Sequence, residues 1–471
     1  MTNDPCFMTA VEAGALLKAR KLSPVELVRA FLERIERLDP LIRAYIRVTA
    51  EQALAEAKAA EAEIAAGRYR GPLHGIPYAL KDIIDYAGVP TTANSRLLMD
   101  NVPATDSTVV AGLKRAGAVC LGKTAMREFA TGTRHDDLPW PYPLNPWNRA
   151  HEFAGGSSTG SAAAVGAGLA MVALGTDTGG SIRNPSGFCG LAGMKPTYGR
   201  VSRTGVVPNT FTFDSVGPMT WTVADCALVL QAISGFDADD PGGAREPVPD
   251  FSRDLDKGVR GFRIGVIRNF YEDALPADHV MRRAFEEALD VLGGLGARFE
   301  DLRLRSIDDY NTCRTLISGA DHYAIHEKDL RERPHLYGPK LAKRMPAGMM
   351  ISAVDYIQAQ RERLKMAREM ADAFRPFDAV LTLTTLETAP LNDPAEAKGA
   401  FADPSLTRPF NVSGQPAMTV CTGFDERGLP LAMQIAGKAF DEATVLRVGQ
   451  AYERATDWKS RRPALEEKAA A

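Results

Sequence analysis

Two glycine-flanked serines, Ser157 and Ser181, constrain this chain more than any other feature of its sequence. They stand 24 residues apart in GGSSTGSAAAVGAGLAMVALGTDTGGSIR, which runs from Gly155 to Arg183. The alanine-rich apolar segment between them predicts a buried helix that brings two loops to one end of a sheet. Because glycine lacks Cβ, the run that precedes Ser181 can turn tightly and aim consecutive N–H groups at one point.

Neither glycine-rich loop fits a nucleotide-binding motif. A phosphate loop of the GxxxxGK[ST] type requires a lysine that GGSSTGS does not contain. A dinucleotide fingerprint fails because Gly166 and Gly168 are followed by Met171, where a third glycine should stand. The two serines therefore indicate a chemistry other than nucleotide binding.

A serine nucleophile needs a base, and Lys81 is the strongest candidate for one. This lysine lies in the apolar run PYALKDIIDY, where burial would lower its pKa and make the amine a base. The structural alternative is a residue at a strand end that reaches solvent. His74 and His151 are weaker candidates, for which we expect packing or loop hydrogen bonds. Two serines and a desolvated lysine predict acyl transfer.

The charge balance argues against a general nucleic-acid or membrane-surface role, because 56 basic and 59 acidic residues give a net charge of −3. Six scattered cysteines form no CxxC or His-paired motif, which predicts reduced thiols and no metal site. The N-terminus lacks a signal-peptide pattern, and no uncharged apolar run reaches about 18 residues. We expect a cytoplasmic protein without membrane contact and without a cofactor.

The order of local patterns predicts an α/β protein. Residues 1–70 read as a helical N-terminal segment, and residues 71–235 as an α/β catalytic core. Residues 236–471 begin with a Pro- and Gly-rich excursion and then complete the sheet. We expect one domain over residues 1–471. Seven apolar runs are expected strands: IPYAL, AVCLG, VALGT, GFRIGVI, AVLTLTT, AMTVCTGF and LAMQIAG.

An ordered set of motifs resembles the amidase signature family over essentially the whole chain. The motifs are LHGIPYALKD, LGKTAMREFATG, NPWN, GGSSTGS, GTDTGGSIR, CGLAGMKPTYGRVS, SVGPMTWTVADCALVL and PFNVSGQPAMTV. The resemblance implies a large mixed, twisted β-sheet sandwiched between helices. It also implies a Ser–cis-Ser–Lys triad, with a cis peptide between Gly156 and Ser157.

The resemblance assigns a role to each member of that triad. Ser181 would attack the amide carbonyl, Ser157 would relay the proton, and Lys81 would act as base. The expected oxyanion hole comprises backbone N–H groups of Thr178, Gly179, Gly180 and Ser181. The expected supporting residues are Ser158, Asp177 and Arg183.

The sequence also offers candidate residues for substrate contact, on weaker grounds than the triad. The candidates are Ala130, Thr131 and Gly132 in LGKTAMREFATG, and Trp140. Trp140 belongs to HDDLPWPYPLNPW, residues 135–147, which by analogy lies beside the acyl pocket. His135, Asp136, Asp137 and Trp140 would either contact substrate or form a surface loop.

The preferred function is that of a stand-alone amidohydrolase that cleaves a small-molecule carboxamide or anilide. The alternative is the A subunit of a glutamine-dependent tRNA amidotransferase, which belongs to the same family and needs partner subunits. The segment TRHDDLPWPYP favours the hydrolase, because it is unlike the Gly-Ser-Thr-rich stretch typical of the amidotransferase. The third reading is a catalytically inactive binding protein of the same fold. By family analogy a homodimer is possible.

Overall fold

The computed structural model describes residues 4–131, 137–151, 156–273, 276–391 and 405–465. These residues form one sheet of eleven strands in the order β1-β3-β2-β4-β6-β5-β10-β11-β9-β7-β8. The strands are β1 Tyr45–Val48, β2 Pro77–Lys81, β3 Val119–Thr124, β4 Val172–Asp177, β5 Ala192–Lys195, β6 Ser215–Thr220, β7 Arg263–Val266, β8 Arg298–Asp301, β9 Ala379–Leu383, β10 Ala417–Phe424 and β11 Pro430–Ala436.

The sheet is mixed. Strands β3, β2 and β4 run parallel at one end, and β9, β7 and β8 run parallel at the other. Between them, β4, β6, β5, β10, β11 and β9 pair antiparallel in that order. The pairing of β5 with β10 joins strands far apart in the sequence, so both halves of the chain complete one sheet. The predicted mixed α/β fold is confirmed.

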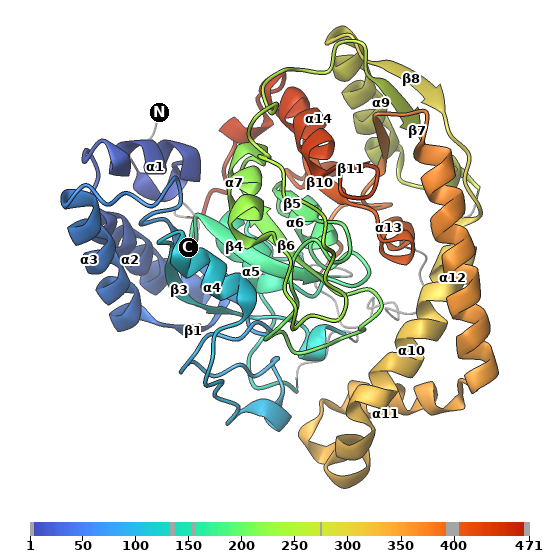
Figure 1. The fold of residues 1–471 in the computed structure, drawn as a ribbon, viewed down its shortest axis with the longest axis horizontal. Helices are drawn as coiled ribbons and strands as arrows, with labels where there is room; N and C mark the ends of the chain where they lie inside the picture. Colours follow the sequence, from blue (N-terminus) through green and yellow to red (C-terminus); the bar gives the residue numbers. More distant parts are fainter. Residues whose placement is uncertain (1–3, 132–136, 152–155, 274–275, 392–404, 466–471) are drawn as a thin grey trace.

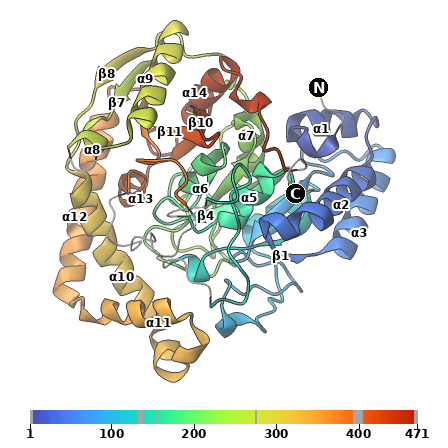
Figure 2. The same cartoon turned by 180° about the vertical axis from the view of Figure 1, so that it is seen from behind.

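Helices lie on both sides of this sheet (Figures 1 and 2). They are α1 Ala10–Lys18, α2 Pro24–Ile42, α3 Ala50–Ala65, α4 Thr108–Arg115, α5 Thr159–Gly166, α6 Arg183–Phe188, α7 Val223–Ile233, α8 Asn269–Glu272, α9 His279–Gly294, α10 Ile307–Glu332, α11 Pro339–Arg344, α12 Ala353–Phe374, α13 Arg408–Ser413 and α14 Glu442–Arg454. The long helices α10 and α12 lie side by side along one flank, with α11 near their far end.

The N-terminal segment is mostly but not wholly helical. Ser23 caps α2 by accepting hydrogen bonds from the N–H groups of Val25 and Glu26, in agreement with the capping signal in the sequence. The four residues of β1 break the helical pattern and pair antiparallel with β3 at the edge of the sheet. So short a strand depends on its partner strand, which a local pattern does not reveal.

The two central helices, α5 and α6, are buried along their whole length. Helix α5 begins directly after Ser157 and Ser158, and α6 begins two residues after Ser181. A side chain at Gly160 would place its Cβ 2.4 Å from the carbonyl oxygen of Ala44 and 2.5 Å from the backbone of Ala125. The absence of Cβ at this position lets α5 pack directly against neighbouring backbone and holds the first serine loop.

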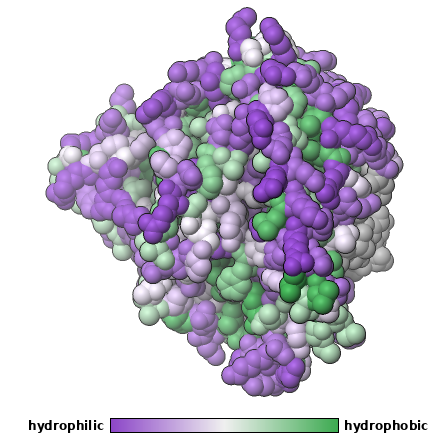
Figure 3. Space-filling view, turned by 45° about the vertical axis from the view of Figure 1, so that its right-hand side comes forward, coloured by the Kyte–Doolittle hydropathy of each residue, from purple (hydrophilic) through white to green (hydrophobic). Residues whose placement is uncertain are grey.

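The face of the molecule in Figure 3 carries hydrophilic and apolar residues side by side. Several large apolar side chains near the start of α12 and along it are exposed: Met349, Met350, Val354, Ile357 and Leu364. Among the described residues, no helix combines the length and apolar character needed to cross a membrane. All six cysteines are buried, unpaired thiols.

Candidate active site

Lys81, Ser157 and Ser181 come from three neighbouring elements. Lys81 is the last residue of β2, Ser157 precedes α5, and Ser181 follows β4, which pairs with β2. The Ser158 N–H donates to the Ser181 carbonyl oxygen over 3.2 Å, and this bond ties the two serine loops together. The structure therefore brings together the three residues that the sequence singled out from separate motifs.

Lys81 is fully buried and faces two hydroxyl groups. Its Nζ lies 2.6 Å from the Oγ of Ser157 and 2.6 Å from the Oγ1 of Thr176. Burial lowers the pKa of Lys81 to about 7, while the carboxylates of Asp214 and Asp177 oppose that shift. The lysine can therefore hold or release a proton near neutral pH. Thr176 was not assigned a role from the sequence, although it stands directly beside Asp177 in the quoted motif GTDTGGSIR.

Ser181 is 8% exposed, and its hydroxyl forms no hydrogen bond with any other described residue. Ser157 and Ser158, by contrast, are fully buried. The Ser158 Oγ donates to the Thr176 carbonyl oxygen and accepts from its N–H, each over 3.2 Å. Ser158 therefore fixes the strand that carries Thr176. Of the two adjacent serines, only Ser157 contacts Lys81 in the structure.

The peptide between Gly156 and Ser157 is trans, because the described residues contain no cis peptide bond. The expectation of a cis unit at this position is wrong for this structure. A trans unit is the ordinary form for a non-proline residue, since the cis form costs about 3–4 kcal/mol.

The turn before Ser181 is organised around the buried carboxylate of Asp177. The N–H groups of Gly180 and Ile182 donate to it over 2.8 and 3.2 Å. Gly180 has φ +114°, and a Cβ there would lie 2.1 Å from the Oγ1 of Thr407. Only glycine accommodates both the conformation and the contact.

One of the expected oxyanion-hole donors, the N–H of Gly180, is already used in a hydrogen bond. Its N–H cannot face a substrate oxygen while it donates to Asp177, which as a buried anion requires hydrogen-bond donors. The N–H groups of Thr178, Gly179 and Ser181 have no acceptor among the described residues. These three remain the candidate donors.

Asp177 and Arg183 form a buried ion pair beneath the turn, with the Nη2 of Arg183 3.0 Å from the Oδ1 of Asp177. Burial alone would raise the pKa of Asp177, but the Arg183 guanidinium and hydrogen bonds from Arg183 and Asn411 hold it well below its usual range. Arg183 also donates to the Thr407 carbonyl oxygen and to the side chains of Asn411 and Gln434. The C-terminal part of the chain therefore braces the turn.

We expect replacement of Arg183 by methionine to lower the free energy of unfolding by about 3–5 kcal/mol, because Asp177 would be left as a buried charge without its counter-charge. Urea unfolding followed by circular dichroism measures this loss. Arg282→Met, at an exposed position of α9, is the matched control and should change stability by less than about 0.5 kcal/mol. A loss below about 1 kcal/mol for Arg183→Met would show that the pair does not brace the turn.

The expected substrate contacts are only partly described. Residues 127–131 run beside the first serine, since the Arg127 N–H donates to the Ser157 carbonyl oxygen over 3.4 Å. Ala130 is buried with φ +56°, and its carbonyl oxygen accepts from the side-chain amide of Asn209. Thr131 is partly exposed. Gly132, His135 and Asp136 lie outside the described residues.

Two residues in the described part of the 135–147 segment bond to residues earlier in the chain. The backbone of Trp140 bonds to the side chain of Asn94, and its side chain is partly exposed. Asp137 is exposed and pairs with Arg96.

The two histidines considered as weaker base candidates, His74 and His151, make the structural contacts expected of them. His74 accepts from the Arg70 N–H and lies near Glu63, while His151 contacts the Ala389 carbonyl oxygen.

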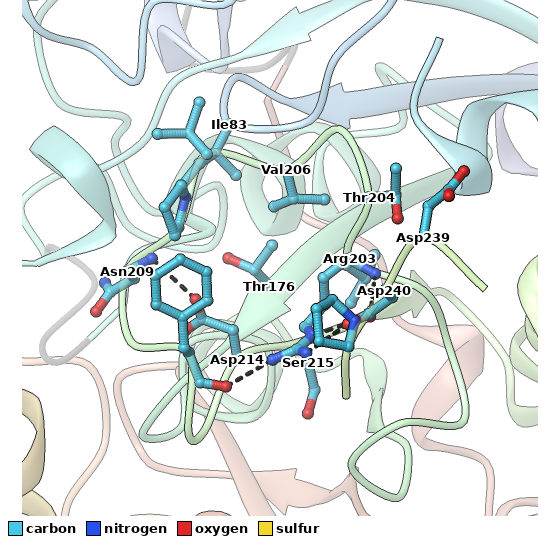
Figure 4. A pocket seen from close by; sticks show the side chains of 15 residues that line it. Ile83, Thr176, Arg203, Thr204, Val206, Asn209, Asp214, Ser215, Asp239 and Asp240 are labelled. Carbon is cyan, nitrogen blue, oxygen red and sulfur yellow. Dashed lines mark hydrogen bonds and ion pairs between the residues drawn. The ribbon is translucent and has the colours of Figure 1, made fainter. Parts of the chain in front are cut away.

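A cavity of about 180 Å³ adjoins this cluster (Figure 4). Thr176 and Asp214 belong to its lining and connect it with Lys81 and with Thr178, whose hydroxyl donates to Asp214 over 2.6 Å. The rest of the lining combines apolar side chains with the Arg203–Asp240 ion pair. The lining does not include the two serines. Among the described residues, no cluster of His, Cys, Asp or Glu could hold a metal ion.

Comparisons with known proteins point to one protein family. The family model described as Amidase matches residues 26–446. The A subunit of a glutamyl-tRNA(Gln) amidotransferase from Dehalococcoides mccartyi strain 195 is 38% identical, and the alignment covers 97% of this chain and 99% of that protein.

Two solved structures superpose closely. One, from a study of a vestigial protein complex and the origins of an s-triazine catabolic enzyme, has a TM-score of 0.89 at 32% identity and covers 95% of this chain and 98% of its own. A bacterial aryl acylamidase has a TM-score of 0.87 at 28% identity, covering 97% and 99%.

Proposed function

This chain belongs to the amidase signature family, and from that premise we propose that it cleaves an amide C–N bond through an acyl-enzyme on Ser181. The family resemblance identified from the motifs is confirmed, and with it the conclusion that the chain is an amide-cleaving enzyme. The observation that carries the proposed mechanism is the 2.6 Å contact between Lys81 and Ser157, in a loop that is bonded to Ser181 through the Ser158 N–H.

In the proposed reaction, neutral Lys81 takes the proton of the Ser157 hydroxyl as Ser157 takes the proton of Ser181. The Ser181 oxygen then attacks the amide carbonyl and a tetrahedral oxyanion forms. The bond to nitrogen breaks as Ser157 returns a proton to the leaving amine or ammonia. Water releases the acid by the same route in reverse, which restores Ser181.

The N–H groups of Thr178, Gly179 and Ser181 support the proposed oxyanion, because they are the unengaged donors of the turn among the described residues. One such donor is typically worth about 10²–10³ in rate. Asp177 acts through the backbone as a positioning residue, since it holds the N–H groups of Gly180 and Ile182.

Two physiological roles are compatible with this chemistry, and each has an observation in its favour. The curated relative named above is the A subunit of an amidotransferase and matches almost the whole chain, which favours the subunit role. The close superposition on an aryl acylamidase favours a stand-alone hydrolase. The sequence relatives support the subunit role more strongly than the hydrolase that the motifs alone had favoured. In that role the chain would release ammonia from glutamine and act with protein partners.

Ammonia or amine release by the purified chain tests the proposal. We would compare glutamine with aryl, aliphatic and ureido amides, with and without the chains that co-purify with an affinity-tagged copy from its host. The subunit role predicts that glutamine turnover rises at least about tenfold with the co-purified chains. Equal turnover of free amides without them would contradict it and identify a stand-alone hydrolase. The absence of turnover for every amide under both conditions would contradict amide cleavage itself.

A further inference from the structure

Arg314, on helix α10, places its guanidinium against the turn that carries the proposed nucleophile. A Cβ built on Gly179 would lie 3.3 Å from the Nε of Arg314 and 3.4 Å from its Nη2. Gly179 stands two residues before Ser181, so the guanidinium lies beside the turn, close to the space that a side chain at Gly179 would occupy. No sequence motif pointed to this residue.

The Arg314 guanidinium has no anionic partner among the described residues. Its Nε is buried and donates no hydrogen bond. The two acids whose charges act on Arg314, Asp214 and Asp177, already accept hydrogen bonds from their own partners. Asp214 accepts from Thr178 and from the N–H groups of Asn209 and Thr210, and Asp177 accepts from Arg183 and Asn411. Neither carboxylate forms an ion pair with Arg314.

Further positive charge surrounds this guanidinium. Burial, together with the neighbouring charges of Arg408 and Arg344, lowers the pKa of Arg314 to about 9, although the carboxylates of Asp214 and Asp177 oppose that shift. Arg408 follows Thr407, whose hydroxyl donates to the Gly179 carbonyl oxygen over 2.9 Å. Arg408 itself donates to Asn311 over 2.6 Å, which connects it to α10. Arg408 on α13 therefore adds positive charge near Arg314 on α10.

A desolvated cation without a counter-charge is costly, and an arriving anion would recover that cost. The planar guanidinium matches a carboxylate in a two-bond, fork-like arrangement. Its position beside Gly179 limits the distance between the two groups, because an anion bound there must lie within a few bonds of a carbonyl group attacked by Ser181.

We propose that Arg314 binds a carboxylate group of the substrate, so that the amide cleaved at Ser181 is a small molecule with a carboxylate a few bonds from the scissile carbonyl. This inference rests on the amide cleavage proposed above. Arg314 would act as a specificity-determining residue that touches the part of the substrate that does not react.

Matched pairs of amides test the proposal: succinamate against its methyl ester, and glutamine against its α-carboxamide. We expect the chain, with its co-purified partners where these are required, to favour the carboxylate member of one pair. In Arg314→Gln that preference in kcat/KM should fall about 10- to 100-fold through KM, because a charge-assisted hydrogen bond is lost. Turnover of the neutral member should stay within about twofold.

Two control variants sharpen this test. Arg314→Lys keeps the charge but not the fork, and should retain part of the preference. Arg331→Gln, on the same helix with a side chain 71% exposed, should behave as wild type. Equal turnover of both members by the wild type would overturn the proposal. So would an equal loss for both members in Arg314→Gln, which would place Arg314 at the oxyanion instead.

A binding measurement separates the failure of this inference from the failure of the proposed reaction. Calorimetric titration of Ser181→Ala with succinate or glutarate, and with butyrate as monocarboxylate control, requires no turnover. Dicarboxylate binding that weakens at least about tenfold in Ser181→Ala/Arg314→Gln supports the carboxylate site even if no amide is cleaved. Binding that does not depend on Arg314 overturns the site even if amides are cleaved. Thermal melting of each variant confirms that it folds.

Discussion

Replacement of Ser181 by alanine is expected to lower kcat for amide cleavage by about 10⁴-fold or more, because the attacking oxygen is removed. The residual rate would come from the oxyanion donors and from binding. The same variant should lose covalent labelling by a fluorophosphonate, measured as the mass of the adduct on intact protein. Loss of both signals would identify Ser181 as the nucleophile.

The matched control for this experiment is Ser186→Ala. Ser186 lies five residues further along in α6, is also buried, and has an Oγ without a hydrogen-bond partner among the described residues. This variant should keep wild-type kcat and full labelling. An adduct that still forms on Ser181→Ala, or that disappears in Ser186→Ala, would reject the assignment.

Replacement of Lys81 by methionine is the second large change, with an expected loss in kcat/KM of about 10³-fold or more because the proposed base is removed. The wild-type profile should rise from about pH 6 to pH 8 and then level. Only the neutral amine accepts a proton, and with the pKa of Lys81 lowered to about 7 its neutral fraction grows over that range. In Lys81→Met this rise should vanish from the remaining activity.

Lys195 supplies a control of unusual stringency. It is a second buried lysine, and burial lowers its pKa to about 7 as well, but it lies on β5 and donates to the Pro196 carbonyl oxygen. Lys195→Met should keep the rise between about pH 6 and 8, measured as kcat/KM in buffers of constant ionic strength. A rise that follows Lys195 rather than Lys81 would contradict the proposed base.

The strands predicted from the sequence are those whose residues alone favour a buried strand. AVLTLTT and LAMQIAG consist mainly of apolar and β-branched residues, and both form strands within the sheet rather than at its edge. The strands β6 and β8 were not predicted, for opposite reasons. SVGPMT contains glycine and proline and is stabilised by β4 and β5 on either side. RFED is polar and lies at the sheet edge. In both, the partner strand overrides local preference.

For the candidate site, the sequence identified the residues that stand in motifs. It did not identify residues far away in the sequence that contact them in the fold. Asn411 and Gln434 bond to Arg183, which lies more than 200 residues earlier in the chain. Only the fold brings them together. Arg314 is one of two arginines on the polar helix α10, and only the fold places it beside Gly179. The state of the Gly156–Ser157 peptide and the engagement of the Gly180 N–H are likewise properties of three-dimensional packing.

The Ser181 turn depends on contacts with Thr407, Asn411 and Gln434. It can therefore be completed only late in the synthesis of the chain. A ribosome that has just completed the triad must still add more than 200 residues before Arg183 can meet its partners. At ordinary elongation rates this takes roughly 10–50 s. Throughout that interval the nascent chain carries Lys81, Ser157 and Ser181 without the contacts of Arg183 to Thr407, Asn411 and Gln434. We therefore expect amide-cleaving activity to arise only late in synthesis, after Gln434 has been added.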